Sequence, residues 1–70
     1  MKTEEKIYIA SKYAEKGYSY EDLKYGDDLY HLDGSDDKET ILDEIWEYVA
    51  EYEDYGSIAF REKYKAYKLY

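Results

Sequence analysis

The residues of this chain that could do chemistry are its carboxylates, one histidine and four serines. Eighteen of the 70 residues are Asp or Glu, and there is no cysteine. His31 is the only imidazole, so no serine has the partners of a catalytic triad. A transition-metal site would lack a second imidazole or a thiolate, and no glycine-rich phosphate loop is present. We therefore predict that the chain is not an enzyme and holds no metal or other cofactor.

A calcium site of the EF-hand type is excluded by register. Aligning Gly34 with the invariant glycine of that loop places Leu29 and Thr40 where the loop needs Asp and Glu.

The carboxylates gather in the middle of the chain. Residues 20–54 carry a net charge of −12, whereas residues 1–19 and 55–70 carry +1 and +3. This sign disfavours bare nucleic acid and anionic membranes as partners, and it favours a basic protein. No apolar run approaches the ~20 residues of a membrane span, and the first residues lack a signal-peptide core. We expect a cytoplasmic protein.

The elements that must position these carboxylates are helices. Thr3 is expected to cap a helix over about residues 4–16, and Ser19 begins a capping-box pattern that leads to a short helix ending near Gly26. Each glycine stands where a helix could end in the left-handed conformation. Segment 25–34 is predicted to be a connector, with a small hairpin as the alternative.

Two further helices come next, so the expected fold class is all-α. Ser35 or Asp36 opens the longest helix, about residues 36–55, and Ser57 caps a last helix with one face formed by Phe60, Tyr64 and Tyr67. The chain is predicted to be one domain, residues 1–70, built as a compact bundle of three or four short helices. The hairpin alternative would make the fold α+β.

The longest helix has one apolar and one acidic arc at about 100° per residue. The apolar arc comprises Ile41, Leu42, Ile45, Trp46, Tyr48, Val49 and Tyr52. The opposite arc comprises Asp36, Asp43, Glu44, Glu47, Glu51 and Asp54. The arc from Asp43 to Asp54 spans roughly 16 Å and carries five charges. That is about one charge per 3–4 Å, close to the ~3.4 Å rise per phosphate along one DNA strand. No lysine stands at a compensating helical position, so stability alone would not choose this arrangement.

Three interpretations of the acidic arc remain open. The simplest is a solvated face that aids solubility. In the second, Arg61, Lys65 and Lys68 of the last helix cover the acids, within one chain or across a homodimer. In the third, the arc imitates a nucleic-acid backbone and occupies the basic groove of a DNA-binding protein, with tyrosines as anchors at the interface.

The predicted partner-binding surface is based on the third interpretation. It consists of the acidic arc together with the tyrosines and acids expected beside it: Asp36, Asp43, Glu44, Glu47, Glu51, Asp54, Tyr48, Tyr52, Tyr55, Asp27, Asp28 and Tyr30.

Direct DNA binding is not expected, although residues 10–26 have the outline of a helix–turn–helix. A DNA-reading second helix offers Arg, Lys, Asn or Gln to bases and phosphates. Here the segment "YEDLKYGDD" offers four acids and one lysine.

In size, acidity and lack of catalytic residues, the chain resembles, as a class, the small inhibitors that bacteriophages encode against host nucleases and DNA enzymes. These include anti-CRISPR proteins and uracil-DNA glycosylase inhibitors. The resemblance rests on no shared motif and assigns no residue. It implies a DNA mimic that inhibits a basic nucleic-acid-binding protein, a nuclease or other DNA enzyme, in the host cytoplasm. The alternative is an acidic adaptor or regulatory module for another basic protein surface, as a monomer or a homodimer.

Overall fold

The computed structural model describes residues 1–63, with the backbone alone at Tyr55, Ser57 and Arg61. Over this range the chain forms helices and no strand, so the expected all-α fold class is confirmed and the hairpin alternative is wrong. Residues 64–70 of the predicted last helix fall outside it, among them Tyr64, Lys65, Tyr67 and Lys68.

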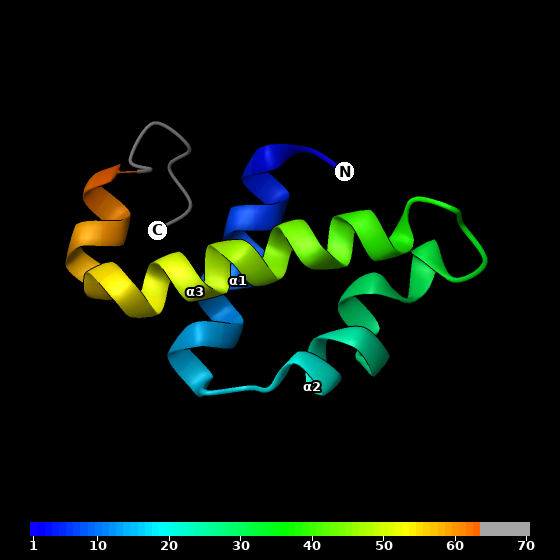
Figure 1. The fold of residues 1–70 in the computed structure, drawn as a ribbon, viewed down its shortest axis with the longest axis horizontal. Helices are drawn as coiled ribbons and strands as arrows, with labels where there is room; N and C mark the ends of the chain where they lie inside the picture. The colour runs from blue at the N-terminus through cyan, green and yellow to red at the C-terminus, as the bar shows by residue number, and fades with distance from the viewer. Residues whose placement is uncertain (64–70) are drawn as a thin grey trace.

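Four helical elements form a small bundle in the described part of the chain. Helix α1 (Thr3–Lys16) crosses behind the long helix α3 (Lys38–Lys63). Helix α2 (Tyr20–Tyr25) and the 3-10 helix η1 (Asp27–Leu32) connect them along one edge of the molecule (Figure 1). None of the described helices is long and apolar enough to cross a membrane.

Helix α1 begins one residue earlier than expected. Lys2 is the N-cap residue and makes no side-chain cap bond, so the prediction that Thr3 caps the helix is wrong. The helix ends as predicted, with Gly17 in the left-handed conformation. Its buried face includes Ile7 and Ala10, both fully buried.

The predicted capping box of α2 is confirmed. The Ser19 hydroxyl accepts a hydrogen bond from the Asp22 amide at 3.2 Å, and the Asp22 carboxylate accepts one from the Ser19 amide at 2.8 Å. Gly26 comes directly after the helix, but its backbone is extended rather than left-handed. A Cβ there would lie 2.5 Å from the Asp22 carbonyl oxygen and 2.9 Å from the Tyr13 hydroxyl, so close approach explains this glycine.

The predicted connector around residues 25–34 contains the regular element η1. In a 3-10 helix, residues three apart lie one above the other. Leu29 is fully buried and Leu32 is partly buried against the same core, so their spacing of three suits this helix type.

Helix α3 begins at Lys38, two to three residues later than expected. The Ser35 hydroxyl accepts a hydrogen bond from the Asp37 amide at 3.2 Å, which holds a turn before the helix. Asp36 therefore lies outside the helix.

Gly56 interrupts α3 near the predicted end of the longest helix. Its φ of 75° and ψ of 165° are not helical, and the chain changes direction there before continuing to Lys63 (Figure 1). Phe60, beyond the break, is fully buried and lies 4.9 Å from the Tyr52 ring, centroid to centroid. The segment after Gly56 thus folds back onto the bundle.

The core lies where α1 and α3 cross and is closed by α2 and η1. Its larger cluster comprises Ile9, Ala10, Tyr13, Leu23, Leu29, Ile41, Leu42, Ile45 and Val49. A smaller cluster comprises Ile7, Tyr52 and Phe60. The predicted apolar arc of α3 is therefore the core face, and the side opposite to it is left to solvent.

Candidate interaction surface

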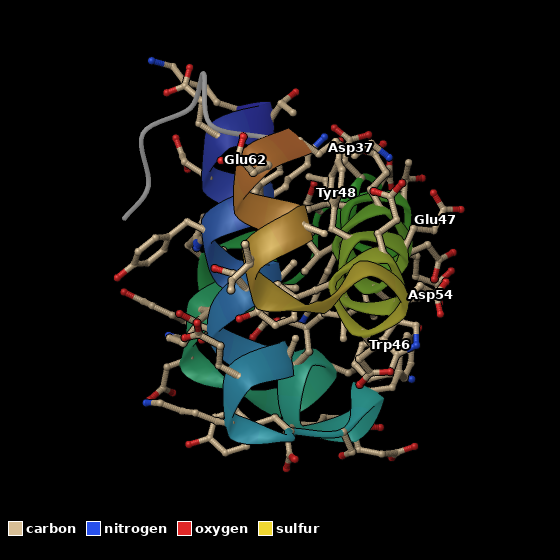
Figure 2. All side chains as sticks on the ribbon, turned by 90° about the vertical axis from the view of Figure 1, so that its left-hand side faces the viewer. Asp37, Trp46, Glu47, Tyr48, Asp54 and Glu62 are labelled. Carbon is tan, nitrogen blue, oxygen red and sulfur yellow. The ribbon has the colours of Figure 1, made fainter. Side chains whose placement is uncertain are left out.

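Four acids line the side of α3 that faces away from the core: Glu39, Asp43, Glu47 and Asp54, here called the outer row. All four side chains are exposed. Within the part of the chain that the structure describes, no lysine or arginine side chain lies within ion-pair distance of any of them. Glu47 and Asp54 point away from α1 (Figure 2). The outer row is therefore negative charge without a described counter-charge.

The spacing of the outer row is wider than the sequence predicts. Its members stand at intervals of four, four and seven residues, which is about 22 Å of helix at ~1.5 Å per residue. The open charges are therefore about 7–8 Å apart on average, roughly twice the ~3.4 Å rise per phosphate of one DNA strand. The row matches about every second phosphate.

Two predicted members of the acidic arc are compensated by lysines from elsewhere in the chain. Glu44 forms an ion pair with Lys6 of α1. Glu51 accepts a hydrogen bond from the Lys63 ammonium at 2.9 Å, after the chain has turned back at Gly56. These two carboxylates lie on the flank of α3 and contribute to tertiary structure as well as to surface charge.

The predicted tyrosine anchors do not lie together on the surface. Tyr52 is 6% exposed, and its hydroxyl donates a hydrogen bond to Glu15 at 2.8 Å. Tyr48 is partly buried between α3 and α1 (Figure 2). The side chain of Tyr55 is outside what the structure describes. Tyr52 is thus a core residue, because it stands at a core position of the helical period.

The predicted residues of segment 25–34 lie on η1, away from the outer row. Asp27 and Tyr30 are exposed, as is Asp36 in the turn before α3. Asp28 is different, because its two oxygens accept hydrogen bonds from the Lys12 ammonium at 2.8 Å and the Tyr13 hydroxyl at 2.6 Å.

Burial and hydrogen bonding shift the pKa values of the two groups in this contact, the Asp28 carboxyl and the Tyr13 hydroxyl. Burial alone would raise the pKa of the Asp28 carboxyl, but the hydrogen bonds from Lys12 and Tyr13 outweigh it and leave that pKa below its ordinary value. Burial, together with the hydrogen bond to Asp28, raises the pKa of the Tyr13 hydroxyl. The ionised Asp28 carboxylate therefore connects η1 to α1 through its hydrogen bonds with Lys12 and Tyr13.

An aromatic pair flanks the outer row and was not among the predicted site residues. The rings of Trp46 and Tyr20 meet edge to face, with centroids 5.4 Å apart, and the Tyr20 hydroxyl donates to Asp43 at 3.4 Å. Trp46 lies on the side of α3 next to α2 (Figure 2). The signal available in the sequence was Trp46 at the edge of the apolar arc, where a large ring is only partly buried.

The described residues contain no group of three or more His, Cys, Asp or Glu side chains placed to hold a metal ion. His31 is exposed on η1, with its ring 6.1 Å from that of Tyr30. The arrangement offers surface charge and aromatic contact area.

No protein-family model, curated protein or solved structure matches the chain.

Proposed function

We propose that the protein is an inhibitor that occupies the nucleic-acid-binding groove of a basic partner, with the outer row taking the place of phosphates. The observation that supports this is the outer row itself, a line of exposed carboxylates on one helix without a described cation beside it. Glu44 and Glu51 show that lysines of this chain do compensate neighbouring acids. A rigid line of open charge attracts a cationic surface at long range.

The partner is a DNA enzyme such as a nuclease of a bacterial defence system, and the protein acts as a phage-encoded, anti-CRISPR-like inhibitor. Phosphate-binding grooves gain most of their affinity from backbone charge and little from base identity. A row that matches every second phosphate can therefore fill such a groove without imitating a particular base sequence.

The test is displacement of DNA-bound proteins. A bacterial lysate is loaded on immobilised duplex DNA at about 50 mM salt, and bound proteins are eluted at constant salt with the purified chain. Two double variants are compared with it: Glu47→Gln with Asp54→Asn in the outer row, and Glu21→Gln with Asp27→Asn on α2 and η1. Both doubles remove two exposed negative charges, so they change the net charge of −8 by the same amount.

We expect the native chain and the α2/η1 double to elute the same DNA enzyme, and the outer-row double to need about tenfold more protein. That factor corresponds to about 1.4 kcal/mol, or roughly 0.7 kcal/mol for each charge, within the range of exposed ion pairs. Equal elution by both doubles would show a bulk polyanion effect. No elution by the native chain would contradict inhibition of this kind.

A second function, an acidic adaptor for another basic protein, is favoured by one observation. Tyr25 and Tyr30 are 74% and 66% exposed, and both lie on the α2–η1 side rather than beside the outer row. Exposed tyrosines provide stiff contact area with a hydroxyl, as at many protein interfaces.

Salt separates the two functions. At ~0.5 M salt the screening length is only a few Å, so a complex held by the outer row dissociates, whereas one held by Tyr25 and Tyr30 persists. Binding that survives this salt and is lost on replacing both tyrosines with serine would favour the adaptor.

A further inference from the structure

A hollow of about 350 Å³ lies at the junction of α1 and η1, apart from the outer row. It is lined by Glu4, Glu5, Tyr8, Ile9 and Asp28. Glu47 and Asp54 of the outer row lie on the side of α3 that faces away from α1 (Figure 2). The hollow is therefore a separate surface feature, and a ligand that binds in it does so independently of the function proposed for the outer row.

The lining of the hollow is mainly apolar, and Glu4 and Glu5 add two carboxylates to it. Tyr8 is 50% exposed, and Ile9, although only 8% exposed, also lines the hollow and provides aliphatic surface. Glu4 and Glu5 are exposed, and in the described part of the chain neither forms an ion pair or a hydrogen bond through its side chain. The hollow thus combines apolar contact area with two carboxylates that have no described counter-charge.

Asp28 forms part of the wall of the hollow but adds no unpaired charge to it. Its oxygens already accept from the Lys12 ammonium and the Tyr13 hydroxyl, so its negative charge is balanced by Lys12. The net charge that a ligand would meet comes from Glu4 and Glu5.

Acids in the first helical turn have an ordinary explanation, because they interact favourably with the helix dipole. That explanation accounts for Glu4 and Glu5 but not for an exposed aromatic ring beside a hollow at the same place. Tyr8 forms none of the described ring pairs or cation–π contacts. A ligand that uses both features has a cationic head and an apolar stem.

We propose that this hollow receives an arginine side chain of a partner protein. The arginine stem covers Ile9 and the edge of Tyr8, as long cationic side chains do on apolar surface. The planar guanidinium stacks on the Tyr8 ring and donates paired hydrogen bonds to the carboxylates of Glu4 and Glu5. Lysine, a compact and strongly hydrated charge, can neither stack in this way nor pair in a fork.

The test uses a capped amino acid as the probe. N-acetyl-arginine amide is titrated into the ¹⁵N-labelled full chain, and N-acetyl-citrulline amide, a neutral analogue of similar shape, and N-acetyl-lysine amide serve as comparators. We expect saturable shifts at the amides of Tyr8, Ile9 and Asp28 with roughly millimolar affinity, as suits so small a ligand. Citrulline and lysine should bind at least fivefold more weakly.

Variants locate the site. Glu4→Gln with Glu5→Gln should weaken arginine binding at least fivefold, and Tyr8→Ala should weaken it by a similar factor. The matched control is Glu21→Gln with Glu53→Gln, which removes two exposed acids outside both the hollow and the outer row and should leave the affinity unchanged. The amide spectrum of each variant reports whether it is folded.

Three results would overturn the proposal. These are equal binding of arginine and citrulline, equal binding of arginine and lysine, and shifts at the amides of the outer row rather than at those of the hollow.

Discussion

At the scale of single residues, Asp28 is the side chain on which the fold and the surface depend most directly. It connects η1 to α1 by accepting hydrogen bonds from Lys12 and Tyr13, and it forms one wall of the hollow. The Tyr13 hydroxyl also lies 2.9 Å from the position of a Cβ on residue 26, and the Asp22 carbonyl oxygen lies 2.5 Å from it, so glycine precedes η1. A change at Asp28 should therefore loosen several contacts at once.

Replacing Asp28 with Asn should lower the free energy of unfolding by about 1–2 kcal/mol. Asn keeps one acceptor for Tyr13 but loses the charge that pairs with Lys12, and hydrogen bonds to charged groups contribute about 1.5–3 kcal/mol each. Urea unfolding monitored by circular dichroism at neutral pH measures the change. Asp27→Asn is the matched control, because Asp27 is exposed on the same element and should change the stability little. Equal effects of the two variants would contradict the role given to Asp28.

Asp28 also makes the free energy of unfolding depend on pH in the acidic range. Its folded-state pKa is below the ordinary Asp value of 3.8, so its stabilising contribution is present above that value. The contribution is lost as pH falls through the lower, folded-state pKa. The native chain should therefore lose more stability than Asp28→Asn between pH 5 and about pH 2. Parallel losses in both proteins would show that Asp28 is not coupled to folding.

At the scale of elements, the break at Gly56 decides the path of the last helical segment. Its φ of 75° and ψ of 165° belong to a region that is essentially restricted to glycine, although a Cβ there would meet no atom within 4 Å. The requirement is thus conformational rather than steric. It allows Phe60 to reach Tyr52 and Ile7, and it brings Lys63 to Glu51.

Gly56→Ala should cost about 1–3 kcal/mol, the usual strain of an L-residue in such a region. The matched control is D-alanine at the same position, introduced by chemical synthesis, which has the same methyl group and favours positive φ. It should retain the native stability. Urea unfolding gives the cost, and NMR contacts between the Phe60 and Tyr52 rings report the path of the segment. Equal destabilisation by both alanines would indicate a steric cause instead.

The elements that the sequence predicted are those with local causes. Ser19 and Asp22 form their capping box within four residues, and Gly17 ends α1 in the left-handed conformation. The 3-10 helix was missed because its two core leucines are too few to show a period, and "DGS" indicated only a turn. For Gly26 the predicted left-handed helix end is wrong: its backbone is extended, and a Cβ there would approach the Asp22 carbonyl oxygen and the hydroxyl of Tyr13, which is distant in sequence.

At the scale of the whole molecule, the predicted acidic arc of α3 divides into two parts. Asp43, Glu47 and Asp54 belong to the outer row, whereas Glu44 and Glu51 form ion pairs with lysines. Ile45 and Val49 indicated the core side of α3 correctly, so the outward direction of Glu47 could be predicted from them. The ion pair of Glu44 could not be predicted, because its lysine comes from α1. Cover of the acids by cations of the last helical segment was one of the open interpretations, but the pairing of Lys63 with Glu51 was not predicted. Helical periodicity describes one helix and contains no information about its neighbours.

The two parts of the arc should affect stability in opposite directions, whatever the partner is. Like charges four residues apart on a helix cost about 0.2–0.5 kcal/mol per pair, and Glu47 has Asp43 at that distance. Glu47→Gln should therefore stabilise the protein slightly, since Gln and Glu have similar helix propensities. Glu44→Gln should destabilise it by about 0.5–1 kcal/mol, because it leaves the partly buried Lys6 ammonium without its carboxylate.

The most direct test of the open outer row is the difference in unfolding free energy between these two variants in urea at low salt. We predict opposite signs relative to the native chain, with a total difference of about 1 kcal/mol, which shrinks as salt screens both effects. If Glu47→Gln instead destabilises the protein as much as Glu44→Gln does, a cation compensates the outer row and no open charge remains to attract a partner.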